Sequence, residues 1–98
     1  MNTITLEGRE YILRCDLNVI ELVEAKYGSV GAVYEKHGEI SCIKFMTAAM
    51  INEHFYAVHS PERVTENEVG AKMKASDIVP VMREVLAALT ECVTPKNA

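Results

Sequence analysis

Residues 1–15 constrain the fold of this chain most, because they predict a β-hairpin that needs a surface to pack on. Residues 3–6 alternate between threonine and aliphatic side chains, residues 10–15 are rich in strand formers, and Gly8 lies between the two runs. An isolated two-stranded hairpin is only marginally stable in water. Its apolar face must therefore pack on the rest of the chain, which carries helical patterns.

Two different turns could join these strands. A turn at residues 8–9 is preferred, because it sets apolar side chains opposite one another, Leu6 facing Tyr11 and Ile4 facing Leu13. A turn at residues 7–8 would instead pair Leu6 with Arg9, and we expect it to mix the two faces of the hairpin. The preferred register predicts one face with four apolar side chains.

Glycine and proline divide the remaining sequence into helices. The first predicted helix has Asp16 or Asn18 as its N-cap, and Asn18 with Glu21 resembles a capping box. A glycine stops this helix at residue 28. Its predicted apolar stripe consists of Leu17, Ile20, Val23 and Tyr27. A short second helical segment runs from Ser29 to Gly38.

The third predicted helix is the longest and has the broadest apolar surface, so we expect it at the centre of the fold. Ser41 is its predicted N-cap. The helix breaks at residues 59–62, because Pro61 is poorly tolerated in a helix interior. We expect Met46 and Met50 on this helix to fill the core.

Two further helices complete the predicted fold. Thr65 and Glu68 form a capping-box pattern for a short helix that extends to about Lys74, on which Met73 suits an exposed role. Ser76 is the predicted cap of the last helix, and Pro80 falls in its first turn. The sequence thus predicts a single α+β domain. It consists of a β-hairpin at residues 1–15, a bundle of four to five helices within residues 16–93, and a flexible tail at residues 94–98.

Composition excludes several classes of function. The chain is 49% hydrophobic and 24% charged, which is ordinary for a globular domain. Its net charge is −4 and its basic residues are scattered, whereas nucleic-acid binders rely on a basic surface. The sequence begins without a signal-peptide pattern and has no apolar run long enough to span a bilayer. We therefore expect neither a nucleic-acid nor a membrane partner.

No set of residues predicts catalysis or cofactor binding. His54 and His59 are five residues apart, a spacing that puts them on different faces of a helix rather than at a shared metal site. The three cysteines are widely spaced and form no metal-binding or disulfide pattern. Cys42 and Cys92 lie on apolar helical stripes, where thiols are usually inert. We expect no catalytic, cofactor-binding or metal residue, and a thiol-based sensor at Cys42 or Cys92 is the weakest alternative.

The opening of the chain carries a family resemblance. Residues 4–16, with the sequence ITLEGREYILRCD, precede a helix with Val19-Ile20-Glu21-Leu22-Val23-Glu24 and Tyr27-Gly28. This layout resembles the tail assembly chaperones of long-tailed bacteriophages, prophages and gene transfer agents. The resemblance implies a non-enzymatic protein in the cytoplasm of a bacterial host. Such a protein binds the tape-measure protein while tail-tube subunits polymerise around it.

The resemblance also implies possible self-association, and it offers no catalytic motif to carry over. It does not identify the binding surface, for which the hairpin face with Arg14 and the last helix are the predicted regions. A second hypothesis is an adaptor or regulatory module of a bacterial host with an unrelated protein partner.

Overall fold

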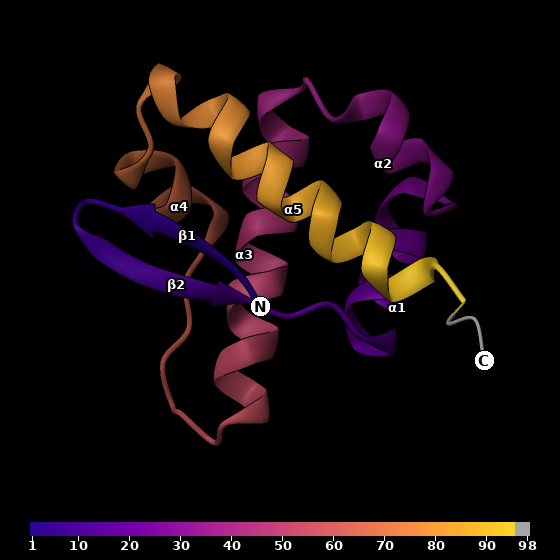
Figure 1. Ribbon diagram of the computed structural model, residues 1–98, viewed down its shortest axis with the longest axis horizontal. Helices are drawn as coiled ribbons and strands as arrows, with labels where there is room; N and C mark the ends of the chain where they lie inside the picture. Colours follow the sequence, from indigo (N-terminus) through magenta and orange to yellow (C-terminus); the bar gives the residue numbers. More distant parts are fainter. Residues whose placement is uncertain (96–98) are drawn as a thin grey trace.

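The computed structural model describes residues 1–95, in which a two-stranded hairpin precedes five α-helices and one 3₁₀ turn (Figure 1). The predicted α+β fold is therefore confirmed. In chain order the elements are β1 (Asn2–Leu6), β2 (Arg9–Leu13), α1 (Leu17–Tyr27), α2 (Gly31–Lys36), α3 (Ile40–Ala57), α4 (Glu66–Lys72), η1 (Ala75–Asp77) and α5 (Ile78–Val93).

The longest helix, α3, lies at the centre, as its broad apolar surface predicts. It contacts β2, α1, α4 and α5, and α5 in turn contacts β1. Figure 1 shows α5 running across α3, with the hairpin and α4 on one side and α1 and α2 on the other. Buried side chains from the hairpin and from all five α-helices form one hydrophobic core, which includes Met46 and Met50.

The hairpin register corrects the sequence prediction. Ile4 pairs with Tyr11 and Leu6 pairs with Arg9, so the turn lies at residues 7–8. Both turn residues have positive φ, 49° and 79°, as in the type I′ turns that match the twist of a hairpin. The apolar side chains of both strands are nevertheless buried together. The two registers differ by two residues, and such a shift keeps every side chain on its own face. The expectation that this turn mixes the faces was wrong.

The first helix begins two positions earlier than the Asn18 cap predicts, so the other predicted cap, Asp16, is the one that forms. Asp16 is the N-cap, and its side chain accepts hydrogen bonds from the backbone N–H groups of Asn18 and Val19, at 3.1 and 3.4 Å. Asn18 therefore lies inside the helix and forms no capping box. Leu17 is 81% exposed rather than part of the apolar stripe. The buried residues Val19 and Val23 lie four apart and set the inward face, and Leu17 falls opposite.

Two other predicted caps were also wrong. Glu39, not Ser41, precedes α3, and it makes no side-chain capping bond. Ser76 lies within the 3₁₀ turn η1, so α5 begins at Ile78. Pro80 occupies the first turn of α5 as predicted.

The remaining helix ends agree with the sequence patterns. Gly28 ends α1 in the left-handed conformation, and the Thr65 capping box opens α4.

Of the predicted tail at residues 94–98, only residues 94 and 95 belong to the described part of the chain. None of the helices within residues 1–95 combines the length and apolar character that crossing a membrane requires.

Candidate functional site

An apolar groove lies where the start of α3, the end of α4 and the start of α5 meet, and its volume is about 430 Å³. The apolar side chains that line it are Ile40, Ile43, Met73, Ala75 and Ile78. Lys44 and Lys74 stand beside them. We name this feature the α4 groove. It is the candidate binding site, because binding sites in proteins are typically apolar concavities with a few polar groups at their edge.

One wall of the groove is α4, which is held by its first turn. The hydroxyl of Thr65 accepts a hydrogen bond from the backbone N–H of Glu68 at 3.0 Å, and the Glu68 carboxylate accepts one from the N–H of Thr65 at 3.3 Å. Val69 is buried in the core. A seven-residue helix is too short to persist on its own, so these contacts decide where the wall stands.

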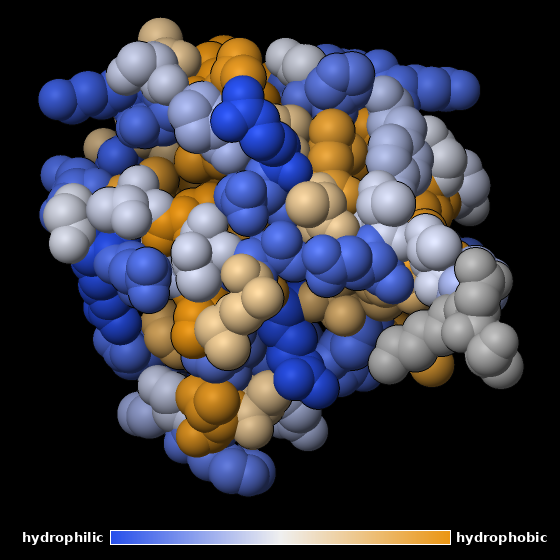
Figure 2. Space-filling view, in the orientation of Figure 1, coloured by the Kyte–Doolittle hydropathy of each residue, from blue (hydrophilic) through white to orange (hydrophobic). Residues whose placement is uncertain are grey.

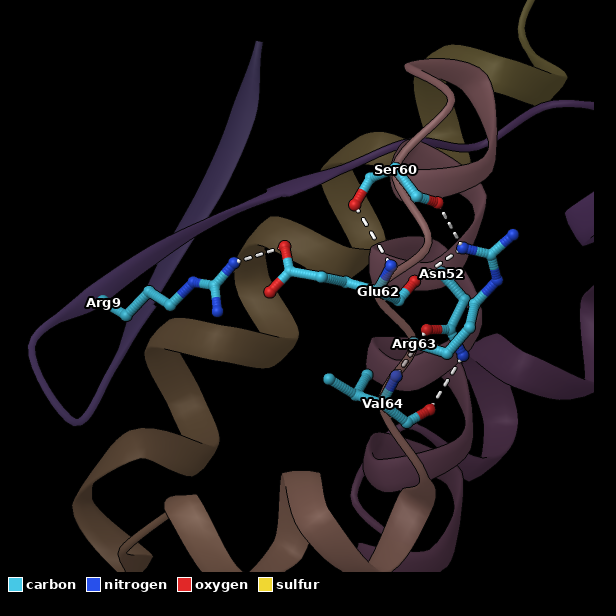
Figure 3. Close-up of polar contacts among 6 residues, drawn as sticks. All are labelled: Arg9, Asn52, Ser60, Glu62, Arg63 and Val64. Atoms are coloured by element: carbon cyan, nitrogen blue, oxygen red, sulfur yellow. Dashed lines mark hydrogen bonds and ion pairs between the residues drawn. The ribbon is translucent and has the colours of Figure 1, made fainter.

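The loop that leads into α4 is fastened to α3 by Asn52. The Asn52 side chain donates to the carbonyl of Val64 and accepts from its N–H, both at 2.8 Å. Figure 3 shows this clamp, with Ser60, Glu62 and Arg63 along the same loop. The Ser60 hydroxyl accepts from the N–H of Glu62 at 3.1 Å. Asn52 and its neighbours therefore fix the direction from which the chain enters α4.

The same loop is tied to the hairpin through Arg9. Its guanidinium lies 2.9 Å from the Glu62 carboxylate, and Figure 3 shows it reaching across from the hairpin. The guanidinium also sits over the ring of Tyr11, 4.9 Å from the ring centroid. Because the hydrogen bond from Arg9 favours the charged form, the pKa of Glu62 is lowered from its usual value. Both groups are exposed, so this pair orients the loop more than it stabilises the fold.

Gly70 determines the position of Lys44 in the groove. A Cβ atom at residue 70 would lie 3.0 Å from Cδ of Lys44, closer than such contacts normally come. The glycine thus allows the aliphatic stem of Lys44, which is half-buried, to lie against α4. A Cβ atom at position 70 would require the Lys44 stem to shift by a few tenths of an ångström.

The edge of the groove is positively charged although the chain carries a net charge of −4. Among residues 1–95, Lys44 and Lys74 have no ion-pair partner, whereas Lys36 pairs with Glu39 and Lys72 with Glu7. Glu66 and Lys44 both line a second hollow, but they form no ion pair with each other. Two lysines at the groove are therefore available to a negatively charged partner.

Ile40 contributes exposed apolar surface to the groove, although Leu17 and Val79 elsewhere on the chain are more exposed. The Ile40 side chain is 62% exposed at the first position of α3. Met73, the methionine for which we expected an exposed role, lines the groove and is partly buried. Figure 2 shows the face that carries α5 and the hairpin, on which apolar residues appear as separate patches among hydrophilic residues. Isolated apolar residues are ordinary on a protein surface, but a concavity lined by several is not.

A second hollow, of about 530 Å³, joins the two regions that the sequence suggested for binding. It lies between the end of β2, the end of α3 and the last turns of α5. Arg14, Cys15, His54 and Cys92 line it. We name it the Cys15 hollow. It brings Arg14 and the last turns of the last helix together, whereas only Met73 and Ile78, the first residue of that helix, connect the groove to the sequence predictions.

The thiols fit a structural role better than a reactive one. Cys42 is buried, as expected, and burial raises the pKa of its thiol. Burial also raises the pKa of Cys15, and its contact with Cys92 raises it further. A raised pKa leaves little thiolate at neutral pH, which makes a thiol a poor nucleophile.

His59 lies apart from His54, in the loop after α3, where its φ is 61°.

Two carboxyl groups meet at the start of α1. Burial alone would raise the pKa of Asp16, but hydrogen bonds with Glu53, with Arg14 and with two backbone N–H groups outweigh it and lower the pKa. Burial and the contact with Asp16 raise the pKa of Glu53. Asn18 donates to the Glu53 carboxylate at 3.0 Å. The arrangement caps α1 and joins it to α3.

Neither a metal site nor a known relative directs the assignment of this chain. Within residues 1–95, no group of three or more histidine, cysteine, aspartate or glutamate side chains is arranged to hold a metal ion. Comparisons with protein-family models, with curated proteins and with solved structures found no match. The geometry of the α4 groove is therefore the strongest indication of function.

Proposed function

We propose that this chain is a non-enzymatic binding module that holds an apolar helical segment of a larger protein in the α4 groove. The observation that carries the proposal is the groove itself, in which Ile40, Ile43, Met73 and Ile78 gather beside two lysines. Burying one aliphatic side chain contributes about 1.5–3 kcal/mol. A partner helix that covers Ile40 and inserts one such side chain of its own gains about 3–6 kcal/mol from the two burials, so further contacts along the helix must offset the rest of the cost of association.

The proposed partner is the tape-measure protein of a phage-type tail, with the tail-tube subunits as the next candidates. This part of the proposal comes from the resemblance of residues 4–28 to tail assembly chaperones. The physical logic is consistent with it. An unassembled tape-measure protein exposes long amphipathic helices, and a small protein with an apolar groove can cover them until the tube forms. The chain would then act in the cytoplasm of the bacterial host.

Co-expression with the tape-measure product of the same gene cluster tests the proposal. We expect a soluble complex in size exclusion with light scattering, from a partner that aggregates when expressed alone. Ile40→Asp places a carboxylate on the groove and should weaken the complex about tenfold or more. Leu17→Asp is the matched control, because Leu17 is also an exposed aliphatic residue at the first position of a helix.

Aspartate is favourable at the start of a helix, so both variants should fold. A partner that is equally soluble with and without this chain would contradict the proposal and favour the adaptor hypothesis. Equal loss of binding in both variants would contradict the role of the groove.

A further inference from the structure

We propose that the α4 groove selects acidic amphipathic helices, in which a large aliphatic residue lies one helical turn from a carboxylate. The aliphatic side chain enters between Ile43, Met73 and Ile78, and the carboxylate pairs with Lys44 or Lys74. This inference rests on the proposed function and adds the chemistry by which the groove recognises its partner.

The position of Lys44 supports this selectivity. Its stem lies against Gly70, so the side chain is partly ordered before any partner arrives. An ordered lysine loses less conformational freedom on pairing than a free one does. Lys44 also lies four residues after Ile40, on the same face of α3. The apolar edge of the groove and its positive charge are therefore adjacent.

Lys74, in the turn between α4 and η1, supplies a second positive charge at the groove. Its backbone N–H donates to the Asp77 carboxylate at 2.8 Å, which fixes the turn into α5, while its side chain is exposed. Residues four apart on a helix face the same way. A helix with glutamate four residues from a leucine can therefore contact the apolar floor and one of these lysines at the same time.

The charge of the chain as a whole gives the contact its specificity. With a net charge of −4, most of the surface repels an acidic helix, and the groove edge attracts it. An apolar and basic surface could also bind an anionic membrane, but the negative net charge of the chain disfavours that binding. The concave shape of the site also fits a helix better than a lipid surface.

Fluorescence anisotropy with two labelled peptides tests the inference. Both are alanine-rich helices of about 15 residues with leucines on one face, and they differ only in glutamate or lysine four residues after the central leucine. We expect the wild-type chain to bind the glutamate peptide about two- to fivefold more tightly for each lysine engaged, and the preference should shrink as salt rises.

Charge reversal provides the matched variants. Lys74→Glu and the Lys44→Glu/Lys74→Glu double variant should remove or invert the preference. Arg83→Glu causes the same change in net charge as Lys74→Glu, at an exposed residue of α5 that has no ion pair among residues 1–95, and it should retain the preference. Because the Lys74 side chain is exposed, Lys74→Glu should fold even if Lys44→Glu disturbs α3.

Three results would overturn the inference. Equal binding of the two peptides would do so, as would a preference unchanged by Lys74→Glu and the double variant. Binding to phosphatidylglycerol vesicles that depends on the lysines, with no peptide binding, would assign the surface to lipid instead. If Ile40→Asp still abolishes the tape-measure complex while charge has no effect, the proposed function stands and only the selectivity fails.

Discussion

Asn52 on α3 makes two hydrogen bonds with the backbone of Val64, both 2.8 Å long. Its side-chain amide thus pairs both the N–H and the carbonyl of this loop residue, as a neighbouring strand would in a sheet. Val64 immediately precedes the Thr65 cap of α4, which is one wall of the groove. Asn52 on the central helix therefore helps to position the wall of the candidate site, together with the Thr65 capping box.

Replacing Asn52 with alanine should destabilise the protein by about 1–3 kcal/mol, because it leaves the N–H and carbonyl of Val64 unpaired in a partly buried position. Urea denaturation measures this change. Amide hydrogen exchange should also accelerate in α4 more than in α1. Asn18→Ala removes one exposed hydrogen bond on α1 and serves as the control, with a smaller expected effect. Equal losses in the two variants would contradict the clamp.

Glu7 in the hairpin turn lowers the stability of the fold, so a substitution there can stabilise the protein. This residue has φ of 49°, a conformation that suits asparagine or glycine far better than glutamate. Glu7→Asn should raise the free energy of unfolding by about 0.5–1 kcal/mol. Glu7→Gln is the control, since it removes the charge that pairs with Lys72 at 3.6 Å without relieving the backbone. A stabilisation by both variants would show that charge, not conformation, is responsible.

The helices and the hairpin could be predicted from residues close together in sequence, but the register of the hairpin could not. Alternation around Gly8 predicted the hairpin, and Gly28, Pro61 and the Thr65 box placed helix boundaries, because each acts on its own neighbours. The two candidate turns bury the same side chains, so the apolar pattern alone could not separate them. The structure adopts the turn whose type I′ geometry matches the twist of the strands, although this puts Glu7 in a conformation that glutamate does not favour.

The groove was not predictable because it depends on contacts between distant residues. The stem of Lys44 on α3 needs the missing side chain of Gly70 on α4, and nothing local to either residue indicates the other. Met73 was the one available signal, as a methionine on a short polar helix. Of the expected surfaces, Arg14 and the end of the last helix meet at the Cys15 hollow, and only Ile78 at the start of that helix reaches the groove.

Stability should depend on pH through Glu53 and Asp16. The pKa of Glu53 is raised in the folded protein, so its contribution is fully present below its unfolded pKa and is lost as pH rises through the folded one. The pKa of Asp16 is lowered, so its contribution has the opposite sign and is lost as pH falls. Near neutral pH the two ionised carboxylates repel each other.

Glu53→Gln keeps a neutral hydrogen-bond donor beside Asp16. Its stability relative to the wild type should therefore increase as pH rises from about 4 to about 7. Urea denaturation across this range measures the trend. In an Asp16→Asn background, which retains a good N-cap, the trend should disappear. If it persists there, the pairing of these two carboxyl groups is not its cause.

The thiols offer a direct test of the sensor alternative. Since burial raises the pKa of Cys42 and Cys15, both should resist iodoacetamide at neutral pH in the native protein and react fully in urea. Mass spectrometry of peptides after timed alkylation distinguishes the sites. Rapid native labelling of Cys42 or Cys92 would revive a sensor function, whereas slow labelling of Cys42 supports its place in the core.

Mapping the contact surface by NMR tests the central claim most directly. Amide chemical shifts of the isotope-labelled chain would be followed during titration with a soluble helical fragment of the tape-measure protein. We predict that the perturbed amides cluster at residues 40–44 and 70–78, on the walls of the α4 groove, and that Ile40→Asp abolishes the changes. Perturbations centred on Arg14, Cys15 and Cys92, or no perturbation at all, would contradict it.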